Sequence, residues 1–231
     1  MEAFVLDPAR LDEPDGVLGA IITEEVSANG RRLFHKGHRL TAADLPILAT
    51  VGRPIHAVRL GPADVHEDEA GMRLAQAVAG DGIELQGPRQ SRVNLIARHK
   101  GLLRIDTATL LQLNRLPGVT IFTLYDRLVV LPGTMLAGVK IAPVAIDREI
   151  LATAERLAAA QPVIQVKAFL PLKVGVVSTE AMEGRARERF RETVTRKIGW
   201  YGGSVIGFAD LPNDAAQVAQ AITTFIEQGA G

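Results

Sequence analysis

The sequence predicts a protein of the α/β plus β class, built from three successive parts. These are an N-terminal ββαβ unit, a small β-rich sandwich or barrel, and the first half, βαβα, of an open parallel α/β domain. Two patterns carry the prediction: short apolar segments alternate with turn residues up to position 144, and longer strand and helix patterns alternate after it. The length of 231 residues allows one large or two modest domains. The expected boundaries are 1–62, 63–146, 147–162 and 163–231.

The ββαβ unit is predicted from a hairpin that is followed by a capped helix. The dipeptide Asn29-Gly30 favours a tight turn between strands over 20–26 and 31–34, because both of its residues tolerate positive φ. Thr41 is a natural N-cap for a helix that follows it, and the apolar residues of that helix form a stripe along one face. A strand over 55–60 completes the unit.

The β-rich part is predicted to begin with a helix over 66–79, whose first turn carries three acids that the helix dipole favours. From 83 to 144, short strands alternate with Pro and Gly turn signals, and 107–114 is expected to form one helical turn. Asp147 is expected to begin a linker helix over 148–159.

The last part has the alternation of a parallel sheet covered by helices. Because such a sheet needs several strands to bury enough apolar area, this half-sheet is expected to be incomplete. Either the chain is a fragment of a longer protein, or another chain supplies the missing strands. The expected strands are 163–170, 173–178 and 204–208, and the expected helices are 184–200 and 214–227.

Composition removes several classes of function. Lysine plus arginine equals aspartate plus glutamate at 26 each, so the basic excess of a nucleic-acid-binding protein is missing. The absence of cysteine excludes disulfides, thiolate nucleophiles and cysteine-ligated metals. No signal peptide and no apolar run of about 18 residues is present, so we expect a soluble, cytoplasmic protein without a membrane partner.

Candidate binding residues gather where the last strands are expected to end. Ser178, Thr179 and Glu180 follow a buried strand, and ligands of open α/β folds bind at the carboxyl ends of strands. An ordinary strand-to-helix turn explains the same residues equally well. Asn213 and Asp214 follow the next strand, and Asn213 is a natural N-cap for the last helix.

The helix over 184–200 is rich in arginine, but glutamates at pairing distance favour a solvated surface. Only Arg185 and Arg187, in its first turn, are placed to reach an anion at the preceding loop. The histidines His35, His38 and His66 are not expected to bind a metal, because nothing in their spacing brings ligands together.

Five segments form an ordered set, at 36–44, 92–97, 101–106, 113–114 and 139–143. Taken together, they resemble a bacterial family of molybdopterin-binding proteins, some of which are fused to a nucleotidyltransferase domain that modifies the molybdenum cofactor. The segment 36–44 is also similar to one in molybdopterin molybdenumtransferases. The resemblance covers nearly the whole chain.

The resemblance implies that 163–231 is the first half of a molybdopterin-binding domain, with two departures. Related enzymes often have Thr-Gly-Asp where this chain has Thr179-Glu180-Ala181, and the adenylyltransferases have an acid where this chain has Asn213. Because magnesium is held by carboxylates, we expect binding rather than turnover. Nucleotidyl or molybdenum transfer, with Mg²⁺, is expected only of a full-length form.

Two hypotheses therefore stand. In the first, the chain binds molybdopterin or adenylylated molybdopterin, and Arg185 helps to neutralise the phosphate. In the second, it is a docking or dimerisation module of a larger cofactor-assembly enzyme, partnered by a second copy or by a nucleotidyltransferase domain. The residues that the first hypothesis places at the cofactor are Ser178, Thr179, Glu180, Arg185, Asn213 and Asp214.

Overall fold

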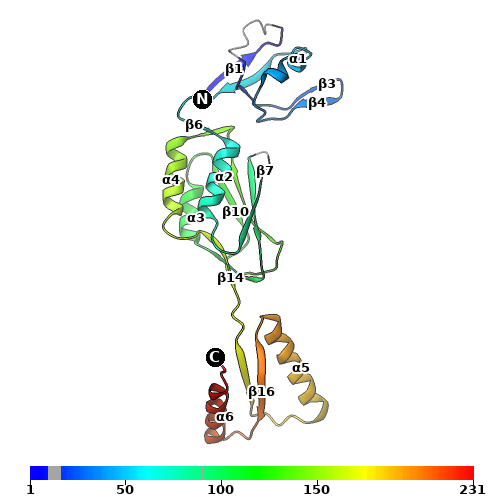
Figure 1. Ribbon diagram of the computed structural model, residues 1–231, viewed down its shortest axis with the longest axis vertical. Coiled ribbons are helices and arrows are strands. Elements are labelled where there is room, and N and C mark those ends of the chain that lie inside the picture. Colours follow the sequence, from blue (N-terminus) through cyan, green and yellow to red (C-terminus); the bar gives the residue numbers. More distant parts are fainter. Residues whose placement is uncertain (10–16, 90) are drawn as a thin grey trace. The chain divides into compact units, whose positions relative to one another are not determined.

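The computed structural model describes residues 1–9, 17–89 and 91–231, which form two compact units, Met1–Lys167 (unit 1) and Ala168–Gly231 (unit 2). Six α-helices and several small sheets confirm the mixed α/β class (Figure 1). The described strands form open sheets and no barrel, so the barrel alternative is wrong. None of the helices in the described ranges has the length and apolar character to cross a lipid bilayer.

Unit 1 begins with a small antiparallel sheet of order β1-β5-β2 and a separate hairpin, β3-β4. The hairpin turn is confirmed, because Asn29 and Gly30 have φ values of 50° and 74°. The single strand expected over 20–26 is divided into β2 and β3, and β1 was not predicted. The strands are β1 (Glu2–Leu6), β2 (Ile21–Ile22), β3 (Val26–Ala28), β4 (Arg31–Phe34) and β5 (Ile55–Arg59).

The helix expected after Thr41 is confirmed but short. A 3₁₀ turn, η2 (Ala42–Asp44), leads into α1 (Leu45–Leu48). The Thr41 backbone N–H donates to Asp44 Oδ2 at 2.8 Å, which completes a capping box. Leu48 is fully buried, so this short helix is held by the apolar cluster of the segment.

The β-rich part contains a four-stranded antiparallel sheet, β10-β12-β8-β7, and a second sheet, β11-β9-β14. A short ladder, β6-β13, lies at the start of the helices. The strands are β6 (Asp64–His66), β7 (Ile83–Arg89), β8 (Arg92–Ala97), β9 (Gly101–Ile105), β10 (Val119–Thr123), β11 (Val129–Val130), β12 (Met135–Ile141), β13 (Ala145–Asp147) and β14 (Ile164–Ala168).

Three helices, α2 (Glu67–Val78), α3 (Thr107–Asn114) and α4 (Arg148–Ala158), lie together beside these strands (Figure 1). The helix α4, expected to be a linker, instead packs on α2 and buries Leu151 in the core of unit 1. A bidentate salt bridge joins the two helices, in which Arg73 donates two hydrogen bonds to the Glu155 carboxylate at 2.8 and 2.9 Å.

The strand expected to open the last domain also belongs to unit 1. The strand β14 lies beside β9, and its residues Ile164 and Val166 are buried in the same core. The two units therefore meet later in the chain than the expected boundary after position 162. Local pattern identified the strand, but its partner lies about sixty residues earlier in the sequence, beyond the reach of a local pattern.

Unit 2 has the predicted βαβα order, with β15 (Lys173–Ser178), α5 (Gly184–Trp200), β16 (Ser204–Asp210) and α6 (Ala215–Glu227). The two strands are parallel. Phe225 of α6 covers the glycines of one face, whereas Phe208 faces Phe190 of α5 on the other, with ring centroids 6.4 Å apart. The sheet of unit 2 therefore lies between its two helices (Figure 1).

The apolar residues of unit 2 are only half-buried. None of them is as well covered as the core of unit 1, and Ser178 is the one buried residue in 168–231. Both strands also have an outer edge without a partner in this unit. These two features support the expectation that the half-sheet is incomplete as it stands.

Candidate functional site

The structure brings the predicted binding loops to one edge of the unit 2 sheet. Ser178 ends β15 opposite Asp210, which ends β16, and the Leu211 N–H donates to the Ser178 carbonyl at 2.9 Å. Thr179 and Glu180 follow Ser178 and are exposed. Because both strands are parallel, the loop before α5 and the loop before α6 leave from the same edge.

The N-terminus of α5 adds a positive potential to this edge. Its N-cap, Glu183, makes no side-chain hydrogen bond to the helix, and the first turn contains no acid. The first backbone N–H groups of a helix are unpaired within it, and together with the helix dipole they favour an anion. Arg185 and Arg187 lie in this turn.

The arginines of α5 differ in what they contact. Arg187 donates to the Met182 carbonyl at 3.0 Å and lies 3.6 Å from Asp210, and Arg191 donates to Asp210 at 2.7 Å. Arg185 is exposed and forms no ion pair with any described residue. It is therefore the cation at this edge that is free to meet a ligand.

Asp210 was missed by the sequence analysis, which ended this strand at position 208. Its carboxylate anchors Arg187 and Arg191, and the Arg191 guanidinium also lies 5.2 Å from the centre of the Phe208 ring. The sequence contained a signal for it: an acid at the carboxyl end of an apolar strand pattern, with several arginines on the helix before that strand.

Asp214, and not Asn213, is the N-cap of α6. The Asp214 carboxylate accepts the Gln217 N–H at 2.9 Å, so the prediction that Asn213 caps this helix is wrong by one residue. Asn213 is exposed beside it. The structure places both residues at the predicted edge, but Asp214 already has a structural role there.

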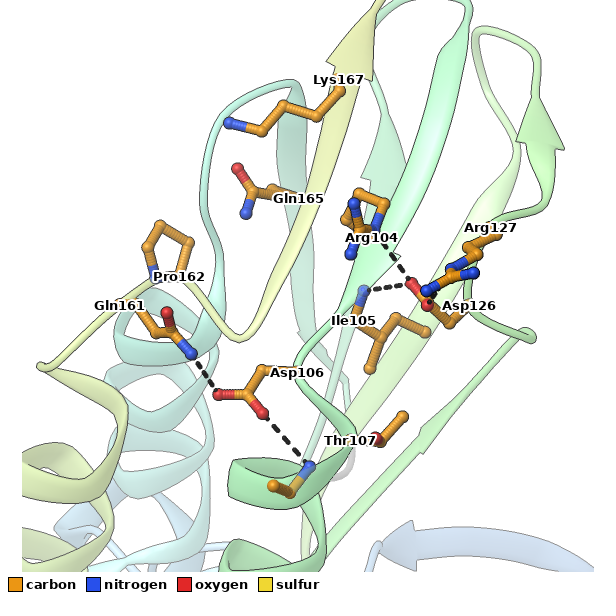
Figure 2. A pocket seen from close by; sticks show the side chains of 11 residues that line it. Arg104, Ile105, Asp106, Thr107, Asp126, Arg127, Gln161, Pro162, Gln165 and Lys167 are labelled. Atoms are coloured by element: carbon orange, nitrogen blue, oxygen red, sulfur yellow. Dashed lines mark hydrogen bonds and ion pairs between the residues drawn. The ribbon is translucent and has the colours of Figure 1, made fainter.

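A polar pocket of about 420 Å³ lies in unit 1 and is shown in Figure 2. Asp106 caps α3 and accepts the Gln161 amide at 2.6 Å, and Asp126 accepts the Ile105 N–H at 2.8 Å beside two arginines. Hydrogen bonds, first from the Thr109 hydroxyl, lower the pKa of Asp106.

The pKa of Asp126 is likewise lowered, chiefly by its backbone hydrogen bond with Ile105 and then by the charge of Arg104. Both carboxylates of this pocket are therefore ionised and engaged in holding the chain, and neither suits a general acid. Lys167 of β14 also lines the pocket, and Figure 2 draws no hydrogen bond or ion pair between it and the other lining residues.

No cluster of three or more His, Cys, Asp or Glu is placed to hold a metal ion within 1–9, 17–89 and 91–231. Comparison of the chain with family models, with curated proteins and with solved structures found no match.

Proposed function

We propose that unit 2 binds the phosphate of molybdopterin, or of its adenylylated form, as a step of molybdenum-cofactor biosynthesis. One observation carries the proposal: the loop after Ser178 opens onto an α5 N-terminus that has no side-chain cap, no acid in its first turn, and an unpaired Arg185. Free N–H groups and a guanidinium supply the charge-assisted donors that a phosphate needs. The identity of the ligand as a pterin rests on the resemblance of the chain to molybdopterin-binding proteins.

The positions of the helices support the same edge. With α5 and α6 on opposite faces, a right-handed crossover after α6 would place a further parallel strand beside the free edge of β15. The order of the strands would then reverse next to β15. Ligands of open α/β sheets bind at such a reversal, outside the carboxyl ends of the strands. The loop that begins after Ser178 occupies this position.

The carboxylates at this edge favour binding over transfer. Glu180 and Asp214 are both exposed, but Asp214 caps α6 and the neighbouring Asp210 is engaged with two arginines, so Glu180 is the acid of the predicted set without such a role. Magnesium between phosphates is usually held by more than one oxygen ligand from the protein. We therefore propose a binding role for this unit.

Replacing Arg185 with alanine tests the proposal. We expect the affinity for molybdopterin to fall by about 1–2 kcal/mol, the scale of one hydrogen bond to a charged group, and to fall further with added salt. Calorimetric titration of the wild type and the variant measures this difference. Arg196→Ala, on the same helix but beyond its first turn, is the matched control and should bind like the wild type. Equal affinity of wild type and Arg185→Ala would place the phosphate elsewhere.

A second function is favoured by the exposed apolar surface of unit 2. Ile222 and Ile226 are 47% and 62% exposed and lie one turn apart on α6, on a helix that packs mainly against β15. A sheet with unpaired edges and uncovered apolar side chains readily pairs with another chain. This surface suits a docking or dimerisation module.

Light scattering over a dilution series tests this second function. We expect the mass to rise with concentration, and Ile226→Lys to suppress the rise because it introduces a charge into the apolar surface. Ile47→Lys is the control, since Ile47 is 41% exposed in unit 1 and should leave the association unchanged. A constant monomer mass for the wild type would remove the docking hypothesis.

A further inference from the structure

A small cavity of about 160 Å³ lies in unit 1, where the first sheets meet the β-rich part. Buried Ile21 and Val58 pack there against Val144, and the N-terminal amino group pairs with Asp64 at 2.5 Å. These contacts join the first sheets of unit 1 to its β-rich part. The residues that line it are Glu25, His35, Lys36, Glu67, Ser91, Lys140 and Ala142.

The floor of the cavity contains a buried carboxyl group. Glu67 is only 5% exposed, although it is the first residue of α2 and one of the three acids expected in the first turn of that helix. The turn after β4 covers it so closely that a Cβ atom on Gly37 would lie 2.5 Å from Glu67 Oε1. Burial, followed by the charge of Asp68, raises the pKa of Glu67.

The backbone beside Glu67 is held in an uncommon conformation. Ser91 is 2% exposed and has a φ of 63°, in the left-handed region that side chains other than glycine rarely adopt. Its N–H donates to Asp68 Oδ1 at 3.0 Å, and its carbonyl would lie 3.1 Å from a Cβ on Gly71. Such conformations gather at ligand sites, where surrounding contacts maintain them.

The rim of the cavity carries the opposite charge. Lys36, in the turn after β4, and Lys140, on β12, line the same small space. The one exposed acid on the rim, Glu25, is paired with Arg32 at 3.3 Å. The two lysines therefore face a single further acid across this space, the buried Glu67.

The volume limits what can enter. About 160 Å³ is roughly five times the ~30 Å³ that one water occupies in the liquid. Pockets for drug-sized ligands are larger, at roughly 300–1,000 Å³. The space suits an ion of about five heavy atoms and is too small for a pterin or a nucleotide.

We infer that this cavity binds a small tetrahedral oxyanion, with Lys36 and Lys140 as its counter-charges and the carboxyl group of Glu67 as a hydrogen-bond donor on its floor. A neutral carboxyl group donates one hydrogen bond, whereas a carboxylate would repel the anion. The site is in unit 1 and is independent of the function proposed for unit 2.

The arrangement predicts that anion binding takes up a proton. The groups that face Glu67 are Asp68 on α2, His66 at the end of β6, Ser91 before β8, Lys36 and His35 after β4, Lys140 on β12, and Glu25. Protonated Glu67 binds the anion, so affinity should fall as the pH rises through the titration of this carboxyl group.

Sulfate is the probe, because it stays dianionic over the pH range in question. Following the backbone amides of Gly37 and Ser91 by NMR during a sulfate titration should give saturable shifts. We expect Lys36→Ala and Lys140→Ala each to weaken binding about tenfold, the effect of one charge-assisted hydrogen bond. Lys167→Ala is the matched control, since Lys167 lines a different pocket.

Glu67→Gln keeps a donor at the floor at every pH. This variant should bind sulfate with a flatter pH dependence than the wild type, and its unchanged amide spectrum elsewhere would show that it is folded. Three results would each overturn the inference: no saturable shift in the wild type, wild-type affinity in both lysine variants, or an equal pH dependence in Glu67→Gln.

Discussion

Gly175→Ala is expected to displace α6 from the sheet of unit 2. The Phe225 side chain lies directly on Gly175, and a Cβ there would meet ring carbons and lie 2.7 Å from Phe225 Cβ. Overpacking of this kind costs typically about 1–3 kcal/mol. Unit 2 buries no apolar residue completely, so we expect its free energy of unfolding to be small, and a loss of this size should be a large part of it.

Trp200 reports the outcome, because it is the only tryptophan in the sequence and ends α5. Its fluorescence should show unit 2 melting at a clearly lower temperature in Gly175→Ala. Gly199→Ala is the control: a Cβ there meets nothing within 4 Å, and alanine is the better helix former. Equal melts of Gly175→Ala and wild type would mean that α6 does not pack on this glycine.

Leu103→Ala is expected to give the largest loss of stability in unit 1. Leu103 on β9 is fully buried in the main apolar cluster of this unit. Removing a buried leucine side chain costs about 2–5 kcal/mol, because apolar contact is lost and a cavity remains.

Denaturant unfolding followed by circular dichroism measures this loss. Leu111→Ala on α3 is the control, since Leu111 is 55% exposed and its replacement should change the free energy of unfolding by no more than about 0.5 kcal/mol. Similar midpoints for the two variants would contradict the position of Leu103 in the core.

The parts of the fold that were predicted from sequence are those with strong local signals. The strand Lys173–Ser178 and the helix Gly184–Trp200 have the expected bounds, because each combines a continuous pattern with clear turn residues. The helix α4 begins directly after Asp147, which caps it, as expected. In contrast, β1 pairs with β5, which lies about fifty residues later, and its mixed sequence gives no local sign of this pairing.

The candidate sites show the same division. Ser178 and Arg185 could be placed at one edge from the order of strands alone, since the carboxyl ends of parallel strands meet there. Glu67 could not be recognised as a buried acid, because the turn that covers it, around Gly37, lies thirty residues earlier in the sequence. Its position in the first turn of α2 was explained by the helix dipole alone.

The most direct test of the central claim is amide hydrogen exchange with and without molybdopterin. If unit 2 binds the phosphate at the edge described, bound cofactor should slow exchange in 178–187 and 210–214, where the loops and the N-terminus of α5 meet. Protection confined to unit 1, for example at the pocket containing Arg104 and Lys167, would contradict the proposed site.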